Sequence, residues 1–134
     1  NLEQLKEFLN TKGELQEFNK GEMIYEYGDR IHQIYLIRSG VVKCFTMDEN
    51  GKELITALRK KDSLLGLERL LENGTHHETT TALEPAELLV VSKQDFLDIL
   101  MENQQLTLEA KVKKGAGFAK KAKKSTIYLL EKFK

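Results

Sequence analysis

Residues 18–66 read FNKGEMIYEYGDRIHQIYLIRSGVVKCFTMDENGKELITALRKKDSLLG. In this stretch, short runs of β-branched, aromatic and aliphatic residues alternate with glycines at positions 21, 28, 40, 51 and 66. Because glycine adopts positive φ without a steric cost, glycines between apolar runs mark tight turns rather than strand interiors. The pattern predicts a β-roll in which short strands follow one another through turns.

The strongest turn signal in the stretch is Asp-Glu-Asn-Gly at residues 48–51. Apolar runs flank it at residues 41–47 and 54–58. An Asn-Gly pair between two such runs predicts a β-hairpin, because both residues tolerate the left-handed angles of a type I′ turn. We therefore expect Asn50 and Gly51 to close a hairpin of this type.

Helical patterns flank the roll, which we place at residues 14–92. An N-terminal helix over residues 1–13 is predicted from apolar residues at helical spacing. These residues are Leu2, Leu5, Phe8 and Leu9. The roll is expected to close with strands over residues 78–83 and 87–91, which meet at a turn containing Pro85.

After the roll, the hydrophobic period changes to three and four residues over positions 93–134. Ser92 is the expected N-cap of the first helix there, with Asp95 placed as in a capping box. Farther on, apolar and small residues alternate steps of four and three, which is typical of a coiled-coil seam. We expect a long helix that forms a homodimer interface through Leu108, Val112, Gly115, Ala119, Ala122 and Thr126.

Length and composition fit one soluble domain with a single core. The chain has 134 residues, is 40% hydrophobic and contains no run long enough to cross a bilayer, so we expect a cytoplasmic protein without a membrane partner. The net charge of zero hides a division: residues 1–110 hold 12 Lys+Arg and 20 Asp+Glu, whereas residues 111–134 hold 9 Lys and 1 Glu. The basic end either solvates a helix or attracts a polyanion or an acidic membrane surface.

Six short motifs run in order along the roll. They are Lys20-Gly21-Glu22, Tyr27-Gly28-Asp29, Ile34-Tyr35-Leu36-Ile37, Ser39-Gly40-Val41-Val42-Lys43, Asn50-Gly51-Lys52-Glu53 and Leu65-Gly66. In order and spacing they resemble the cyclic-nucleotide-binding domain, above all the sensor half of the CRP/FNR family of bacterial transcription regulators. The resemblance covers residues 14–110. It implies a mainly β fold with flanking helices: a jelly-roll-like, cupin-like double-stranded β-helix followed by a long C-terminal dimerisation helix.

The family places its phosphate-binding cassette between Gly66 and Ala82 in this numbering. Members that bind cyclic nucleotides carry a glutamate after the glycine for the ribose, and an arginine followed by a small residue for the cyclic phosphate. This chain has Leu67 after the glycine, and histidines at the place of the arginine. The candidate ligand-binding residues are Gly66, Leu67, Glu68, His76, His77, Thr79 and Thr80. They favour either a neutral or acidic metabolite, or a roll that needs no ligand.

Other site chemistries have little support in the sequence. The one cysteine, Cys44, cannot form an internal disulfide or supply the several thiolates of an iron–sulfur cluster or a structural zinc site. Adjacent His76 and His77 point to opposite sides of an extended chain, which argues against a metal site. No catalytic arrangement is visible, so we expect neither an enzyme nor a resident cofactor beyond a small-molecule effector.

The resemblance implies the effector-sensing and dimerisation domain of a CRP/FNR-like regulator that does not use cyclic AMP in the usual way. Residues 125–134 resemble the start of the family's DNA-binding domain, so DNA contact is expected through a domain that this sequence does not contain. The alternative is a stand-alone cyclic-nucleotide-binding module that controls a partner protein.

Overall fold

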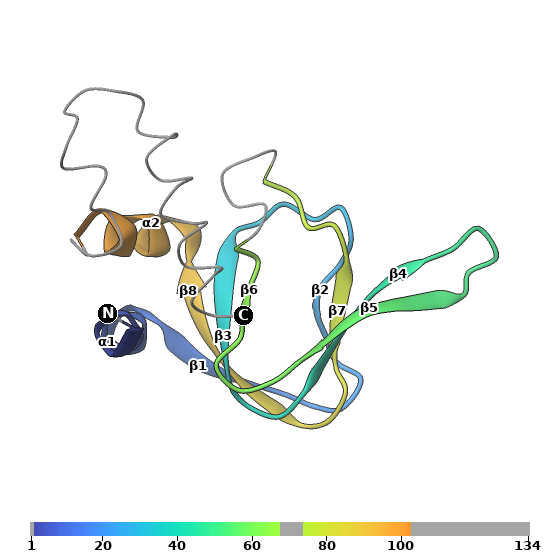
Figure 1. The fold of residues 1–134 in the computed structure, drawn as a ribbon, viewed down its shortest axis with the longest axis horizontal. Coiled ribbons are helices and arrows are strands. Elements are labelled where there is room, and N and C mark those ends of the chain that lie inside the picture. The colour runs from blue at the N-terminus through green and yellow to red at the C-terminus, as the bar shows by residue number, and fades with distance from the viewer. Residues whose placement is uncertain (1, 68–73, 103–134) are drawn as a thin grey trace.

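The computed structural model describes residues 2–67 and 74–102 (Figure 1). The elements are, in order, α1 (Leu2–Lys12), β1 (Glu14–Phe18), β2 (Met23–Tyr25), β3 (Gln33–Ser39), β4 (Val42–Met47), β5 (Glu53–Arg59), β6 (Leu64–Leu65), β7 (Thr79–Ala82), β8 (Ala86–Ser92) and α2 (Lys93–Glu102). The expected mainly β fold with flanking helices is confirmed for this part of the chain. The proposed dimerisation residues, from Leu108 to Thr126, lie outside the described residues.

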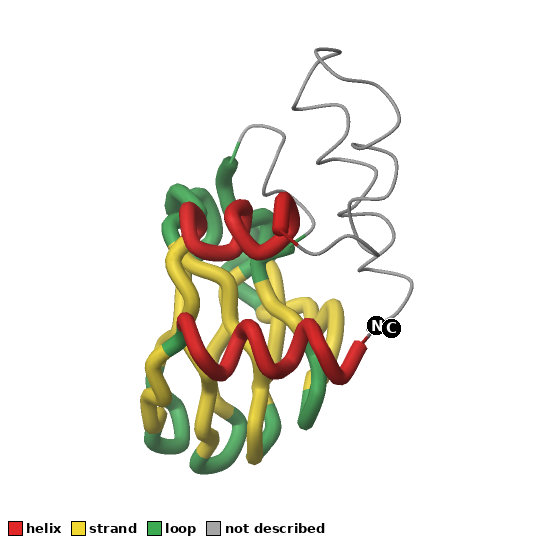
Figure 2. Tube along the Cα trace, turned by 90° about the vertical axis from the view of Figure 1, so that its left-hand side faces the viewer, coloured by secondary structure: helices red, strands yellow, loops and turns green. Residues whose placement is uncertain are grey.

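The strands form two four-stranded antiparallel sheets that face each other. The first sheet has the order β1-β8-β3-β6, and the second has the order β2-β7-β4-β5. Both helices pack on the first sheet, where they contact β8, and α2 also contacts β3 (Figure 2). The β4–β5 hairpin extends away from the body of the roll (Figure 1).

The central strands of the first sheet, β3 and β8, are buried on both faces because their alternate residues belong to two cores. On β3, Ile34 and Leu36 join the core beneath the helices, whereas Tyr35 and Ile37 join the core inside the roll. The residues divide in this way because successive side chains of a strand point to opposite faces of the sheet. Phe96 and Ile99 of α2 are fully buried in the helix-side core, which holds α2 against the sheet.

The predicted β4–β5 hairpin is confirmed, but its turn is not of type I′. Gly51 has a φ of +81°, whereas Asn50 does not adopt positive φ. The N–H of Gly51 donates to the carbonyl of Asp48 at 3.0 Å, which defines a type I turn followed by a glycine bulge. The Asp48 carboxylate accepts from the N–H groups of Asn50 and Lys52, at 2.8 and 2.9 Å. This side chain stabilises right-handed turn angles, which the Asn-Gly pair alone did not predict.

The start of α2 agrees with the sequence. The backbone N–H of Asp95 donates to Ser92 Oγ at 3.0 Å, so Ser92 caps the helix as expected. The strands that close the roll are shifted slightly from their expected bounds: β7 begins at Thr79 rather than at Glu78, and β8 begins at Ala86.

Candidate effector pocket

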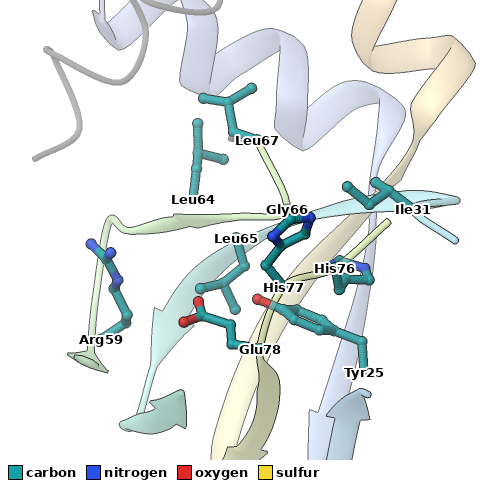
Figure 3. A pocket seen from close by; sticks show the side chains of 10 residues that line it. All are labelled: Tyr25, Ile31, Arg59, Leu64, Leu65, Gly66, Leu67, His76, His77 and Glu78. Atoms are coloured by element: carbon teal, nitrogen blue, oxygen red, sulfur yellow. The ribbon is translucent and has the colours of Figure 1, made fainter. Parts of the chain in front are cut away.

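A small cavity of about 100 Å³ lies where the end of β5, the short strand β6 and the segment before β7 come together (Figure 3). Its lining residues come from both sheets and their connections. They are Tyr25, Ile31, Arg59, Leu64, Leu65, Gly66, Leu67, His76, His77 and Glu78. A ligand bound here would contact both halves of the roll at once.

His76 is held in place by its backbone and by an aromatic stack. Its N–H donates to the carbonyl of Asp29, and its own carbonyl accepts from the N–H of Gly28, both at 2.9 Å. Its ring lies on that of Tyr25, with centroids 3.7 Å apart and an interplanar angle of 12°. Because the side chain is 6% exposed, desolvation lowers its pKa, although Asp29 and Glu78 act in the opposite direction. The geometry therefore favours a neutral imidazole at this wall of the pocket.

Behind Tyr25 lies a set of uncharged polar groups. Burial is the main cause that raises the pKa of Tyr25, and the hydroxyl bonds the Thr80 side chain. Thr80 Oγ1 in turn donates to Cys44 Sγ at 3.4 Å. Burial raises the pKa of the Cys44 thiol to about 11, so this thiol is protonated at neutral pH. Tyr25 and the two residues behind it, Thr80 and Cys44, are therefore uncharged at neutral pH.

Two charged side chains of opposite sign do line the pocket. Arg59 comes from the last position of β5, and Glu78 immediately precedes β7 (Figure 3). Thr56 Oγ1 donates to Glu78 Oε2 at 2.6 Å, which holds the carboxylate at the β5 side of the pocket. The lining thus offers one cation and one anion rather than a purely basic site.

Four of the predicted site residues meet at this cavity. Gly66, Leu67, His76 and His77 all line it. Gly66 has a φ of +91°, and a side chain there would press on the carbonyl of Gln33 at 3.2 Å. Leu67 is buried with 1% exposure, so the position that the family gives to a carboxylate is part of the apolar core.

The remaining predicted residues are placed differently. Thr80 faces the interior beside Cys44, and Thr79 Oγ1 accepts the backbone N–H of Tyr27 at 3.0 Å; neither threonine lines this cavity. Glu68 lies outside the described residues. His77 is exposed while His76 is buried, as expected for neighbours on an extended chain.

Sequence reasoning missed Tyr25 and Arg59. Tyr25 lies in β2, far along the chain from the cassette, and its role depends on the pairing of β2 with β7. Arg59 ends the strand that the hairpin predicts, seven positions before Gly66. The sequence shows a cation close to the cassette, but it does not show that the chain after β5 turns so that Arg59 reaches the cavity.

Two further findings concern the described residues. Across positions 2–67 and 74–102, no group of three or more His, Cys, Asp or Glu side chains could hold a metal ion. Neither α1 nor α2 is long and apolar enough to span a membrane.

The family model of the cyclic nucleotide-binding domain matches residues 15–103 of this chain. This match covers more than half of the sequence and agrees with the two-sheet roll and its flanking helices. The chain belongs to the cyclic nucleotide-binding domain family.

Its relatives are regulators. The regulatory protein HlyX of Actinobacillus pleuropneumoniae is 36% identical over 83 residues, which are 62% of this chain and 33% of that protein. The fumarate and nitrate reduction regulatory protein of Escherichia coli K12 is 34% identical over 83 residues, 62% of this chain and 32% of that protein. The sequence resembles the CRP/FNR branch of the family and spans about a third of the length of these relatives.

The fold is also that of a solved regulator. The crystal structure of the Thermus thermophilus catabolite activator protein superposes with a TM-score of 0.71 at 23% identity. The match covers 96% of this chain and 54% of that protein. At this identity the likeness supports the fold alone.

Proposed function

We propose that this chain is the effector-sensing and dimerisation part of a CRP/FNR-like bacterial transcription regulator, and that its effector is not a cyclic nucleotide bound in the family's usual way. The observation that carries the proposal is the composition of the pocket. Its lining includes residues that the resemblance assigns to the phosphate-binding cassette, yet Leu67 is apolar where members that bind cyclic nucleotides carry a carboxylate, and His76 and His77 stand where they carry an arginine.

The physical case against a cyclic phosphate rests on charge. A phosphate that leaves water needs a strong replacement for its hydration, such as a bidentate arginine and backbone amides. His76 favours its neutral form here, and the one arginine of the described lining, Arg59, shares the cavity with Glu78. The charges of Arg59 and Glu78 cancel, so these two side chains leave no excess positive charge to bind a cyclic phosphate.

The polarity of the lining supports a small polar ligand, because the lining offers both hydrogen-bond donors and hydrogen-bond acceptors. Arg59 can bind an acidic group, Glu78 can accept from a donor, and the His76 ring offers a further polar atom. A small polar metabolite with both donors and acceptors fits this arrangement.

Calorimetric titration of the 134-residue chain with cyclic AMP and cyclic GMP tests the negative part of the proposal. We expect no binding at low micromolar ligand. The double substitution Leu67→Glu, His77→Arg introduces the family's residue types. Because Leu67 is buried, circular dichroism first checks that the variant is folded, and the folded variant is expected to bind cyclic AMP more tightly than the unmodified chain. Low micromolar binding by the unmodified chain, abolished by Arg59→Gln, would show that Arg59 serves as the missing phosphate ligand and would overturn this reading.

Dimerisation is the second part of the proposal and is supported by the seam in the sequence. Apolar and small residues spaced in threes and fours over several turns favour burial against a second copy. Val112→Lys together with Ala119→Lys is expected to give monomers in sedimentation experiments at tens of micromolar protein. A monomeric unmodified chain under the same conditions would refute the dimer.

The relatives support a cytoplasmic role in transcription. Since the chain spans about a third of their length, we place the DNA-contacting surface in a domain outside this sequence. Binding of the effector would then change how the two copies of the roll present that domain.

A further inference from the structure

A second cavity, of about 240 Å³, lies on the opposite side of the first sheet from the roll interior, between α1 and the turn that joins β5 to β6. We call it the α1 pocket. Its lining residues are Lys6, Glu7, Asn10, Leu36, Arg38, Lys61 and Asp62. None of these residues lines the candidate effector pocket.

The α1 pocket gathers positive charge in an acidic part of the molecule. The described residues hold 11 Lys+Arg and 17 Asp+Glu. Three of those cations line this one cavity: Lys6 from α1, Arg38 from β3 and Lys61 from the turn. Glu7 and Asp62 offset two of the charges, so the lining keeps an excess of one positive charge.

The cations are attached to a fixed frame. Arg38 Nη1 donates to Asn10 Oδ1 at 2.6 Å, which orients the guanidinium and uses one of its five N–H groups. The turn is bound to β3, because the N–H of Ile37 donates to the carbonyl of Ser63 at 3.0 Å and the carbonyl of Ile37 accepts from Asp62 N–H at 2.9 Å. Lys61 is therefore carried by a turn that is anchored next to Arg38.

Asp62 occupies an unusual position in this frame. Its φ is +76°, the one positive value of a non-glycine residue in the described part of the chain. Glycine, asparagine and aspartate adopt such angles more readily than other residues, so an aspartate can hold this turn conformation. The Asp62 carboxylate lies 3.3 Å from Lys6 Nζ, so an anion of the protein already occupies part of the cationic cavity.

From these observations we infer that the α1 pocket is a binding site for a small phosphate-type oxyanion, either free or as part of a metabolite. The incoming anion would contact the Arg38 guanidinium and Lys61, and would take the place of the Asp62 carboxylate beside Lys6. A guanidinium matches the geometry of a phosphate, and a charge-assisted bond is stronger than a neutral one. The site goes beyond the proposed effector function, because it lies outside the roll interior.

The test is a titration of the full 134-residue chain with pyrophosphate at low salt, followed by amide chemical shifts in the NMR spectrum and by calorimetry. We expect saturable binding, with the largest shifts at Asn10, Arg38 and Lys61. Arg38→Gln is expected to weaken the affinity by about tenfold, as loss of a charged hydrogen-bond donor predicts. Lys20→Gln is the matched control, because it removes the same charge from an exposed site outside the pocket.

Asp62→Asn gives a second, opposite test. Asparagine tolerates positive φ, so the turn should be kept while the competing carboxylate is lost, and the affinity for pyrophosphate should rise. Titration with glucose 6-phosphate and with inorganic phosphate distinguishes a phosphorylated metabolite from the free ion. The inference is wrong if shifts spread over lysines throughout the chain, including Lys111–Lys124, or if Lys20→Gln weakens binding as much as Arg38→Gln does. Failure here would leave the effector proposal untouched, since that proposal is tested with other ligands.

Discussion

Strands β8 and β5 each have seven residues and are rich in aliphatic side chains, yet their surroundings are opposite. β8 lies between β1 and β3, and its side chains fill the core inside the roll on one face and the core beneath the helices on the other. β5 lies at the edge of the second sheet, where Leu54, Ile55 and Leu58 are exposed. Similar sequences therefore have different roles because of their place in the sheets.

The difference between β8 and β5 suggests how one domain can be stable and still respond to a ligand. Among the described residues, the first sheet holds 10 of the 20 buried hydrophobic side chains and the second sheet holds 5, so the first sheet should resist opening more strongly. Strand β5 has no buried residue, but its last residue, Arg59, reaches the candidate effector pocket, which β6 of the first sheet also lines. A ligand there would contact an edge strand of each sheet, β5 and β6.

The largest expected effect comes from removing side chains of the same type from the two strands. Leu88→Ala in β8 deletes a fully buried side chain and should lower the free energy of unfolding by about 2–5 kcal/mol. Leu58→Ala in β5, where the side chain is 57% exposed, should cost about 0.5 kcal/mol or less. Urea unfolding of both variants measures the difference. Similar losses would mean that the hairpin is packed in solution against something that protects Leu58.

A second comparison concerns two glycines in turns: Gly40 between β3 and β4, and Gly51 between β4 and β5. Both have positive φ, at +84° and +81°. A side chain at Gly40 would overlap the carbonyl of Pro85 and lie 2.6 Å from Ala86 Cα, whereas at Gly51 it would meet nothing within 4 Å. Gly40→Ala should therefore cost about 2–3 kcal/mol and Gly51→Ala about 1 kcal/mol, the latter from backbone angles alone. Thermal unfolding checks this order, and a reversed order would contradict the close approach of the β3–β4 turn to β8.

The smallest expected effect is a pH dependence at the pocket. Burial lowers the pKa of His76 in the folded state below the value of about 6.5 for an unfolded chain. The unfolded state then binds the proton more readily than the folded state. The contribution of neutral His76 to the free energy of unfolding is therefore fully present above about pH 6.5, and it is lost as the pH falls toward the lower pKa of the folded state. His76→Phe keeps a ring against Tyr25 and should reduce the fall in stability between about pH 7 and pH 5.

His77→Gln is the matched control for that experiment, because it removes the exposed neighbour of His76. Urea unfolding at several pH values gives the slope for each variant. An unchanged slope in His76→Phe, or an equal change in the control, would show that burial of His76 does not cause the dependence.

Much of the fold could be predicted from the sequence because its turns are specified locally. The glycines at 21, 28, 40, 51 and 66 all have positive φ, and Ser92 caps α2 through a contact three residues away. The type of the hairpin turn was predicted wrongly, because the Asp48 side chain, rather than the Asn-Gly pair, decides the angles there.

The pocket could be predicted less completely, since its lining depends on contacts between distant segments. Gly66, Leu67, His76 and His77 were found because the cassette is continuous in sequence. Tyr25 and Arg59 were missed because β2 and β5 reach the cavity through sheet pairing. No local pattern marks the α1 pocket either, because its cations come from α1, β3 and a turn.

Hydrogen exchange of the full chain tests most directly whether the roll has a firmly held first sheet and a loosely held edge strand, β5. Amides of β8, bonded between β1 and β3, should exchange only through global unfolding. Strand β5 should open locally, so its amides should exchange at least about a hundredfold faster than those of β8. This ratio corresponds to a difference of roughly 3 kcal/mol in the free energy of opening. Equal protection of β5 and β8 would contradict the division of the roll into a stable half and a responsive half.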